Sequence, residues 1–385
     1  MQIKNYKKQL VLVGGGHANI QVLKKLCMNE FAGLHTILVS EKYCATYSGL
    51  TPAYLQGQVE KKEISIDLQR LCFNAGATFI NDSITSLDAA SQSISLKNYP
   101  CINYDLLSIN TGSISKKSNI QIHNHSYCVM VKPISAFVEQ IEKIDDIVFR
   151  NKKTKLAIIG NGIAGYEISY SLCQRYKNKV TITLIGTNKI NEQNINNTTK
   201  IKLKNIAKNM GIVEKNEIVK QIKPKNVVLS NGDVIESDIN FLSTGTSAPE
   251  WLNESSIETD EKGFAKVNNQ LQSINYENIF ITGDVASLEK NPRAKSGVMA
   301  VRHGETLKEN IFLKLLNKKL LKHKPQKNWL YIINTFQQKA LINFYFLSFH
   351  ASWCWRLKIY IDKSFMRKFE FPNKIKMIKK DIYID

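Results

Sequence analysis

The sequence predicts an α/β protein with two Rossmann-like dinucleotide-binding domains, each a three-layer unit around a parallel sheet, followed by a small α+β cap. Two glycine-rich turns carry this prediction: one spans residues 14–16 and follows an apolar run, and the other spans residues 160–165 and follows a second apolar run. Each turn leads into a helical pattern. Such a strand–turn–helix lets the backbone approach a pyrophosphate closely and aims helix N–H groups at it.

The same order of elements occurs twice. In the first half the pattern predicts a strand at 9–13, a helix at 18–28, a strand at 36–40, a helix at 66–75, a strand at 78–81, and antiparallel strands at 83–87 and 93–96. In the second half it predicts a strand at 156–159, a helix after the turn, a strand at 181–185, a helix at 194–210, and antiparallel strands within 217–229. Each half closes with a strand that ends in Thr-Gly. The repetition indicates an internal duplication of one nucleotide-binding unit.

The remaining elements complete the domain plan. A strand before Asp284 and a helix at 297–312 return the chain to the first unit, and the tail holds strands at 331–336 and 341–346 and a basic helix. We therefore expect a discontinuous first dinucleotide-binding domain at 1–118 and 263–315, a second dinucleotide-binding domain at 119–262, and a cap at 316–385.

Composition narrows the class of protein. The 385 residues carry a net charge of +20, but lysine is spread widely and no nucleic-acid-binding motif occurs, so we expect no nucleic-acid partner. The seven cysteines have no metal-ligand spacing, which predicts no metal site and a reducing compartment. We expect no signal peptide at the polar start of the sequence. We also expect no spanning helix, because the uncharged stretch at 340–355 is shorter than the roughly 20 residues that such a helix needs. The expected location is cytoplasmic, either free or peripheral on the cytoplasmic face of a membrane.

Five motifs in a fixed order carry a resemblance to a known family. They are the first glycine turn, residues 104–112, residues 160–167, residues 243–245, and Thr282-Gly283-Asp284. As a set they resemble the two-dinucleotide-binding-domain flavoproteins of the pyridine nucleotide–disulfide oxidoreductase superfamily. Three further stretches, residues 47–52, 297–304 and 362–369, are most similar to the type II NADH dehydrogenases and to the flavoprotein module associated with selenide, water dikinase. The resemblance implies FAD as cofactor and NADH or NADPH as co-substrate, with hydride transfer to FAD N5 and then two electrons to a quinone-like acceptor.

The resemblance also implies the FAD contacts. Gly14 and Gly16 would hold the pyrophosphate, and Asp284 would accept a hydrogen bond from the ribityl chain. Ser40 or Glu41 stands where the ribose partner is expected, although either could belong to a solvated turn. Further contacts are expected at Pro52, Ile84, Thr111, Gly112, Gly283 and Val298.

In the second unit the resemblance implies a nicotinamide site at Gly160, Gly162, Gly165 and Gly245, with Glu167 as the catalytic residue near the nicotinamide–flavin contact. The second strand of this unit ends at Gly186 without the acid that reads the ribose of NAD. Lys189 could accept the 2′-phosphate of NADPH or be a surface lysine. The choice between NADH and NADPH stays open, and so does a domain that no longer binds nicotinamide.

The cysteines argue against a thiol relay. Disulfide reductases of the superfamily carry a Cys-x4-Cys pair beside the flavin, whereas Cys44 is followed at that spacing by Gly49, and Ser48 stands where the single-cysteine branch has its thiol. A hydroxyl forms no persulfide or thiolate. We expect electrons to leave the flavin directly. The alternatives are a flavoprotein that oxidises sulfur or selenium compounds, and a non-enzymatic FAD-binding redox sensor.

The tail helix is amphipathic and basic. Its apolar residues, at a spacing of four, are Trp353, Leu357, Ile361, Phe365 and Phe369, and basic residues including Lys358 fall on its other faces. Such a helix (353–369) suits an anionic membrane surface, docking on the flavin domain, or both within a homodimer. These alternatives stay open.

Overall fold

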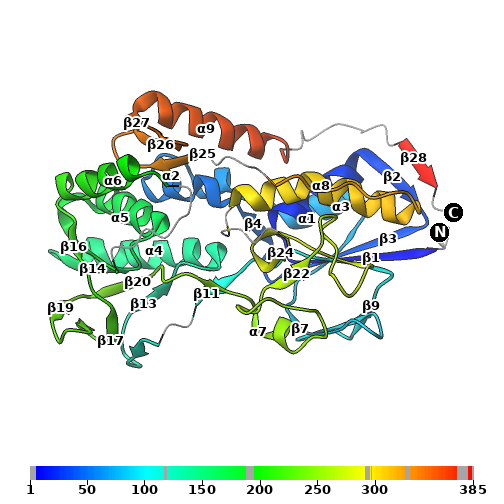
Figure 1. The fold of residues 1–385 in the computed structure, drawn as a ribbon, viewed down its shortest axis with the longest axis horizontal. Coiled ribbons are helices and arrows are strands. Elements are labelled where there is room, and N and C mark those ends of the chain that lie inside the picture. Colours follow the sequence, from blue (N-terminus) through cyan, green and yellow to red (C-terminus); the bar gives the residue numbers. More distant parts are fainter. Residues whose placement is uncertain are drawn as a thin grey trace.

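Two α/β lobes lie side by side, and a small cap lies across one edge of both (Figure 1). The computed structural model describes residues 6–116, 119–187, 195–290, 295, 297–325 and 330–370, and the backbone of 380–383.

The first lobe contains a five-stranded parallel sheet in the order β23-β10-β1-β3-β6. Its strands are β1 (Lys8–Val13), β3 (Leu34–Val39), β6 (Thr78–Ile80), β10 (Leu106–Ile109) and β23 (Ile279–Ile281). The strands are nearly continuous apolar runs because helices cover the sheet. The main helices of this lobe are α1 (His17–Met28), α3 (Leu68–Ala75) and α8 (Gly297–Leu315), and α1 packs against both others.

The second lobe repeats this plan in the order β13-β20-β14-β15-β16. Its strands are β13 (Cys128–Met130), β14 (Thr154–Ile159), β15 (Val180–Ile185), β16 (Val213–Lys215) and β20 (Ile239–Leu242), all paired in parallel. Its helices are α4 (Ile134–Arg150), α5 (Ile163–Tyr176) and α6 (Asn197–Asn209). In both sheets the strand before the glycine turn is central, which confirms the predicted duplicated α/β fold.

Strand β23 follows the second lobe in sequence but pairs with β10 of the first sheet, so the first lobe is built from two chain segments. The connections between the lobes lie together, because β11 (Ile114–Ser115) pairs antiparallel with β21 (Thr246–Ser247). The domain boundaries given above remain a prediction.

Smaller elements flank the two sheets. The antiparallel strands are β7 (Ile84–Asp88), β8 (Ser93–Leu96) and β9 (Ile102–Asn103) in the first lobe, and β17 (Val219–Lys223), β18 (Asn226–Leu229) and β19 (Val234–Glu236) in the second. A short strand, β12 (Gln121–Ile122), pairs with β17 in parallel. The others are β2 (Asn29–Ala32), β4 (Cys44–Thr46), β5 (Ser65–Asp67), β22 (Ala265–Val267), β24 (Ala286–Leu288), α2 (Thr51–Leu55) and α7 (Glu250–Asn253). The backbone of β28 (Lys380–Tyr383) pairs with β2.

The cap consists of β25 (Leu330–Asn334), β26 (Ala340–Phe344) and β27 (Leu347–Ala351), followed by α9 (Ser352–Arg367), the long helix at the top of Figure 1. The predicted apolar stripe of this helix does not act as one face. Phe365 and Phe369 are buried, whereas Trp353, Leu357 and Ile361 are exposed. Helix α9 therefore docks by the buried part and leaves the rest of its apolar stripe on the surface.

Polar contacts fix this docking on the segment 47–49 of the first lobe. The Tyr47 hydroxyl donates to Asp362 Oδ1 (2.9 Å), and Lys358 Nζ donates to the Gly49 carbonyl (2.9 Å). The ring of Phe365 stacks on Tyr47 with centroids 4.8 Å apart. Of the open alternatives for this helix, docking on the first lobe is thus present in the structure, and the outer face stays available.

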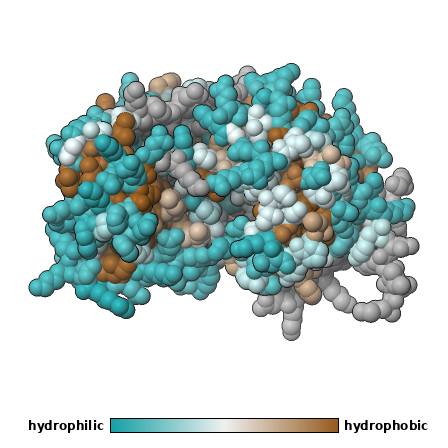
Figure 2. All heavy atoms as spheres, turned by 90° about the horizontal axis from the view of Figure 1, so that it is seen from below, coloured by the Kyte–Doolittle hydropathy of each residue, from teal (hydrophilic) through white to brown (hydrophobic). Residues whose placement is uncertain are grey.

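No helix in the described ranges combines the length and apolar character that crossing a membrane requires. Seen from below, the surface is mostly hydrophilic, with hydrophobic residues gathered in separate groups on its left and right halves (Figure 2). Such a mixture is ordinary for a protein surface. The outer face of α9, at the top of Figure 1, is turned away in that view.

Removing the buried ring of Phe365 tests how the cap is held. The substitution Phe365→Ala should lower the free energy of unfolding by about 3 kcal/mol, because it removes a large buried side chain and leaves a cavity. Tyr360→Ala, on the exposed side of the same helix (69% exposed), should change it by less than about 0.5 kcal/mol. Urea unfolding measures both. Equal effects of the two substitutions would contradict the docked arrangement.

Candidate functional site

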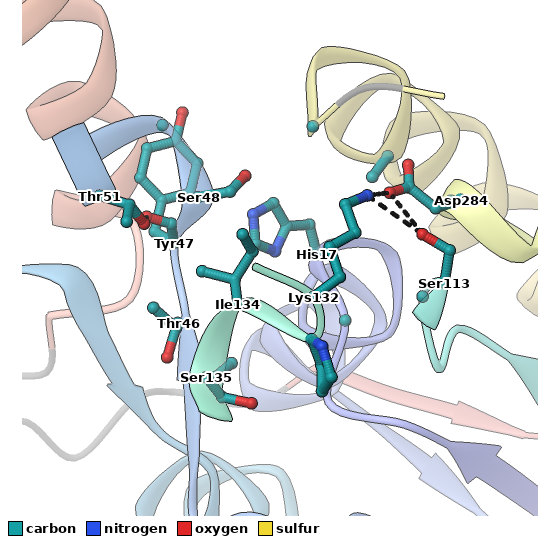
Figure 3. A pocket seen from close by; sticks show the side chains of 18 of the residues that line it. His17, Thr46, Tyr47, Ser48, Thr51, Ser113, Lys132, Ile134, Ser135 and Asp284 are labelled. Carbon is teal, nitrogen blue, oxygen red and sulfur yellow. Dashed lines mark hydrogen bonds and ion pairs between the residues drawn. The ribbon is translucent and has the colours of Figure 1, made fainter. Parts of the chain in front are cut away.

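A cavity of about 1380 Å³ extends from the first glycine turn to the N-terminus of α5 and to α9. The predicted site residues in its lining are Gly14, Gly16, Ser40, Glu41, Pro52, Ile84, Thr111, Gly112, Glu167, Gly283, Asp284 and Val298. The predicted residues outside its lining are Gly160, Gly162, Gly165 and Gly245. The fold thus gathers the expected FAD contacts and Glu167 around one space, part of which Figure 3 shows.

The first glycine turn approaches Asn110 at the end of β10 too closely for any side chain. A Cβ on Gly14, whose φ is +89°, would lie 2.6 Å from the Asn110 carbonyl oxygen, and one on Gly16 would lie 2.1 Å from Asn110 Oδ1. Asn110 Oδ1 accepts the Ala18 N–H (2.9 Å), and its Nδ2 donates to the Thr282 carbonyl (2.8 Å). Sequence reasoning missed Asn110; its signal was a polar residue that ends a buried strand directly before Thr-Gly.

Asn19 occupies the third position of the first fingerprint, where glycine or alanine is usual. Its side chain is fully buried between α1 and the sheet. Nδ2 donates to the Gly14 carbonyl (2.9 Å), and Oδ1 accepts the Ser108 hydroxyl (2.7 Å). The larger side chain is accommodated because its amide satisfies polar groups that the turn would otherwise bury unpaired.

Orphaned polar atoms show that the cavity is built for a polar ligand. Asp284 Oδ1 and the Thr111 hydroxyl are buried and have no hydrogen-bond partner among the described residues. Buried polar groups are normally paired, so these atoms indicate a missing donor or acceptor. A polyhydroxylated chain next to a glycine cradle supplies that partner, and the residues present therefore fit FAD.

The ribose corner contains the two residues between which the sequence did not choose. The Ser40 hydroxyl is buried and donates to the Lys42 carbonyl (3.1 Å) within its own turn. Glu41 is exposed and lines the cavity. This geometry favours Glu41 as the ribose partner, and the assignment remains a prediction.

The second glycine turn shows the same steric logic. A Cβ on Gly160, whose φ is +111°, would lie 2.2 Å from the Ser243 carbonyl oxygen, and one on Gly165 would lie 1.9 Å from the Gly160 carbonyl oxygen. A Cβ on Gly162 would meet nothing within 4 Å. Two glycines thus allow close strand and helix packing, and the third leaves space for a ligand. Lys189, the other nicotinamide candidate, lies outside the described residues.

Three ionisable side chains lie on the cavity wall where α5 meets α9. Glu167 Oε1 accepts the Asn334 N–H (2.7 Å), and Lys358 Nζ donates to Asp362 Oδ2 (3.0 Å). Burial raises the pKa of the Glu167 carboxyl, opposed by the Lys358 ammonium and the Asn334 N–H. In the sequence Lys358 falls on a face of the helix other than the apolar stripe. Its side chain nevertheless points inward, because α9 docks on the first lobe.

A stack of rings forms the neighbouring wall (Figure 3). His17 lies 5.2 Å from Tyr47, centroid to centroid, and Tyr47 stacks in turn on Phe365. Burial lowers the pKa of His17 to about 4 and, together with Asp362, raises the pKa of Tyr47. Both shifts favour the uncharged form of these rings, which line the cavity.

Cysteine and metal chemistry find little support in the described residues. Cys44 is the one cysteine in the described cavity lining. Burial raises the pKa of Cys128 to about 11, which keeps this thiol protonated and unreactive. The described ranges also contain no cluster of three His, Cys, Asp or Glu residues that could hold a metal ion.

Comparison with known proteins gives consistent matches. A family model described as pyridine nucleotide-disulphide oxidoreductase matches residues 8–304. The NADH dehydrogenase-like protein YutJ of Bacillus subtilis (strain 168) is 23% identical over 295 residues, 75% of this chain and 79% of that protein. Ferroptosis suppressor protein 1 of Taeniopygia guttata is 23% identical over 336 residues, 82% of this chain and 83% of that protein.

Two solved structures share the fold. The sulfide:quinone oxidoreductase from Aquifex aeolicus has a TM-score of 0.75 at 21% identity, covering 94% of this chain and 91% of that chain. NDH2 from Plasmodium falciparum in complex with NADH has a TM-score of 0.75 at 14% identity, covering 94% and 98%. At these identities the likeness shows a common architecture.

The buried imidazole of His17 should make stability fall in acid. The folded-state pKa of about 4 lies below the ordinary value of 6.5, so the unfolded chain binds the proton more readily. The contribution of His17 to the free energy of unfolding is therefore fully present above about pH 6.5. It falls by up to about 3 kcal/mol as the pH is lowered toward 4. His17→Phe should therefore flatten the decline of the unfolding free energy between these pH values. The exposed imidazole of His123 is the control, since His123→Asn should leave the profile unchanged; a profile unaltered by His17→Phe contradicts the assignment.

Proposed function

Because the chain belongs to the pyridine nucleotide-disulphide oxidoreductase family, we propose that it is an FAD-dependent NAD(P)H oxidoreductase that passes electrons to a quinone-like acceptor. Family membership confirms the predicted resemblance and makes the protein an oxidoreductase with FAD and a nicotinamide dinucleotide as cofactors. The observation that carries the finer proposal is the single cavity that joins the FAD residues, Glu167 and helix α9.

Bound FAD would accept a hydride from NADH or NADPH and release two electrons to the acceptor. In this chain Gly14 and Gly16 would hold its pyrophosphate, and Asp284 and Thr111 would bind its polyol chain with the buried oxygens that lack partners. The second turn, at Gly160, Gly162 and Gly165, would hold the nicotinamide dinucleotide, with Gly245 beside it. Pro52, Ile84 and Val298 complete the proposed FAD lining, together with Gly112 and Gly283.

We assign no thiol relay to this enzyme. At the position of the second relay cysteine, a Cβ on Gly49 would lie 2.7 Å from Asp362 Oδ1 and 2.7 Å from Tyr47 Cε1. The docked helix α9 thus fills the place that a second cysteine would need, and Ser48 supplies only a hydroxyl. Cys44 alone cannot form an intramolecular disulfide at this site. Electrons would therefore pass from flavin to acceptor directly.

Glu167 is the proposed catalytic residue. Its carboxyl lies in the cavity lining between α5 and the cap, and burial favours its protonated form. A buried carboxyl with a raised pKa can act as a general acid toward a neighbouring base. Reduction of a quinone-like acceptor takes up two electrons and two protons, and Glu167 would supply one of these protons.

The cap suggests how a lipid-soluble acceptor would arrive. Exposed apolar residues gather on the β26–β27 hairpin and the outer face of α9: Phe344, Tyr345, Phe346, Leu347, Phe349, Trp353, Leu357, Tyr360 and Ile361. Arg356, Arg367 and Lys368 are exposed on the same helix. An apolar face bordered by basic side chains suits an anionic membrane surface. Tyr360 and Ile361 also line the cavity, so its mouth would open at that surface.

Anaerobic reduction of the purified protein tests the proposed function. NADH or NADPH should bleach the bound flavin, and a soluble quinone should restore its absorption. Glu167→Gln should retain FAD but slow turnover with the quinone by about 10-fold or more. The control is Glu142→Gln, which changes an exposed carboxylate and should leave both FAD binding and turnover unchanged. Bleaching by sulfide or selenide but by neither nicotinamide would overturn the proposed donor.

Co-sedimentation with lipid vesicles tests the membrane surface. The pair Phe346→Ser and Trp353→Ser should weaken binding to anionic vesicles by at least about 10-fold, since each ring contributes about 1.5 kcal/mol or more when buried in lipid. Phe73→Ser is the matched control, because Phe73 is 84% exposed on α3 of the first lobe. Vesicle binding that survives the cap substitutions, or that falls equally with Phe73→Ser, counts against this surface.

A further inference from the structure

Lys132 is in direct contact with Asp284, the carboxylate proposed to bind FAD. Sequence reasoning did not single out this lysine. It follows β13 in the segment that enters α4 of the second lobe, and its side chain lines the cavity. Lys132 Nζ forms an ion pair with Asp284 Oδ2 and donates to the Ser113 hydroxyl (3.1 Å), which itself donates to Asp284 Oδ2 (3.3 Å). Figure 3 shows the side chains of Lys132 and Ser113 converging on one carboxylate oxygen of Asp284.

The two oxygens of Asp284 are therefore used differently. Oδ2 accepts both protein donors, whereas Oδ1 is buried without a partner among the described residues. An ionised carboxylate oxygen that is buried and unpaired costs free energy unless a ligand donates to it. The Lys132 contact leaves that oxygen for the ligand.

The backbone of Lys132 is itself fixed. Its N–H donates to the Ser115 hydroxyl (3.0 Å), which donates back to the Lys132 carbonyl (3.1 Å). The side chains of Lys132 and Asp284 are only 25% and 15% exposed. An exposed ion pair adds little stability. The Lys132–Asp284 pair is shielded from solvent and its backbone is hydrogen-bonded, so its geometry is better maintained.

A second lysine near this carboxylate has other partners. Lys295 Nζ donates to the Ala286 carbonyl and lies 4.2 Å from the centroid of the Phe264 ring. Burial also lowers the pKa of Lys295 to about 8, so Lys295 loses its proton more readily than an ordinary lysine. Lys132 is thus the cation in contact with Asp284.

We propose that Lys132 is a positioning residue for FAD: it holds the Asp284 carboxylate with Oδ2 engaged and Oδ1 directed to the cofactor's polyol hydroxyl. Lys132 acts through Asp284 and need not contact the cofactor. Since Lys132 belongs to the segment between β13 and α4, the same contact connects Asp284 of the first lobe to the second lobe.

A double-mutant cycle on FAD affinity tests this role. Apoprotein is titrated with FAD for the parent, Lys132→Met, Asp284→Asn and the double variant. Each single substitution should weaken FAD binding by about 10- to 100-fold, because each removes or misplaces a charge-assisted hydrogen bond. The double variant should bind about as weakly as Asp284→Asn alone, since Lys132 has nothing left to position.

Conservative variants and a matched control separate positioning from simple destabilisation. Lys132→Arg should restore most of the affinity, and Lys132→Gln, which keeps a donor without charge, should fall between Arg and Met. Lys225→Met breaks a surface pair with Asp238 (3.0 Å) in the second lobe and should leave FAD affinity unchanged. An FAD analogue that lacks the ribityl hydroxyls should bind equally to the parent and to Lys132→Met.

Additive losses in the cycle would overturn the proposal, because they would place Lys132 in direct contact with FAD or outside the site. Parent-like affinity in both Lys132→Met and Lys132→Gln would also overturn it. A parent protein that takes up no FAD at all is a different result, since it contradicts the cofactor assignment and with it the proposed function. Thermal unfolding of each apoprotein confirms that affinities are compared between folded proteins.

Discussion

The side chain of Asn110 occupies the space where a Cβ on Gly16 would lie, and its carbonyl occupies the space for one on Gly14. From this position Asn110 accepts the Ala18 N–H at the start of α1 and donates to Thr282 at the end of β23. One amide thus joins the first glycine turn, β10 and the returning strand β23. The cavity depends on that contact, because it sets the end of β1 beside the strand end that delivers Asp284.

Two of the lysines in the cavity lining are paired with carboxylates. The chain carries a net charge of +20, but Lys132 pairs with Asp284, and Lys358 pairs with Asp362. Partly buried pairs of this kind lose solvation and are held by several hydrogen bonds, so their geometry is specific. Each pair connects another part of the structure to the first lobe. Lys132 reaches Asp284 from the second lobe, and Lys358 and Asp362 bind the segment 47–49 from the docked cap.

The cap serves the site from two sides of one helix. Its inner face brings Lys358, Asp362 and Phe365 against the segment 47–49, and this contact closes the cavity and excludes a cysteine at Gly49. Its outer face keeps an apolar and basic surface next to the cavity mouth. A single amphipathic stripe could not do both. The helix instead turns its C-terminal aromatic residues inward and leaves the N-terminal ones exposed.

The duplicated fold and the positions of both glycine turns could be predicted from the sequence, because steric limits on a tight turn and the periodicity of buried strands are local properties of the chain. It also placed Asp284 at the end of a strand next to a Thr-Gly motif. The contacts of Asn110, Lys132, Lys358 and Asp362 emerge only from the folded chain, because their partners are distant in sequence. In a lysine-rich chain the sequence around a lysine does not reveal its partner. The partner is the carboxylate that the packing of the lobes and the cap brings within hydrogen-bond distance.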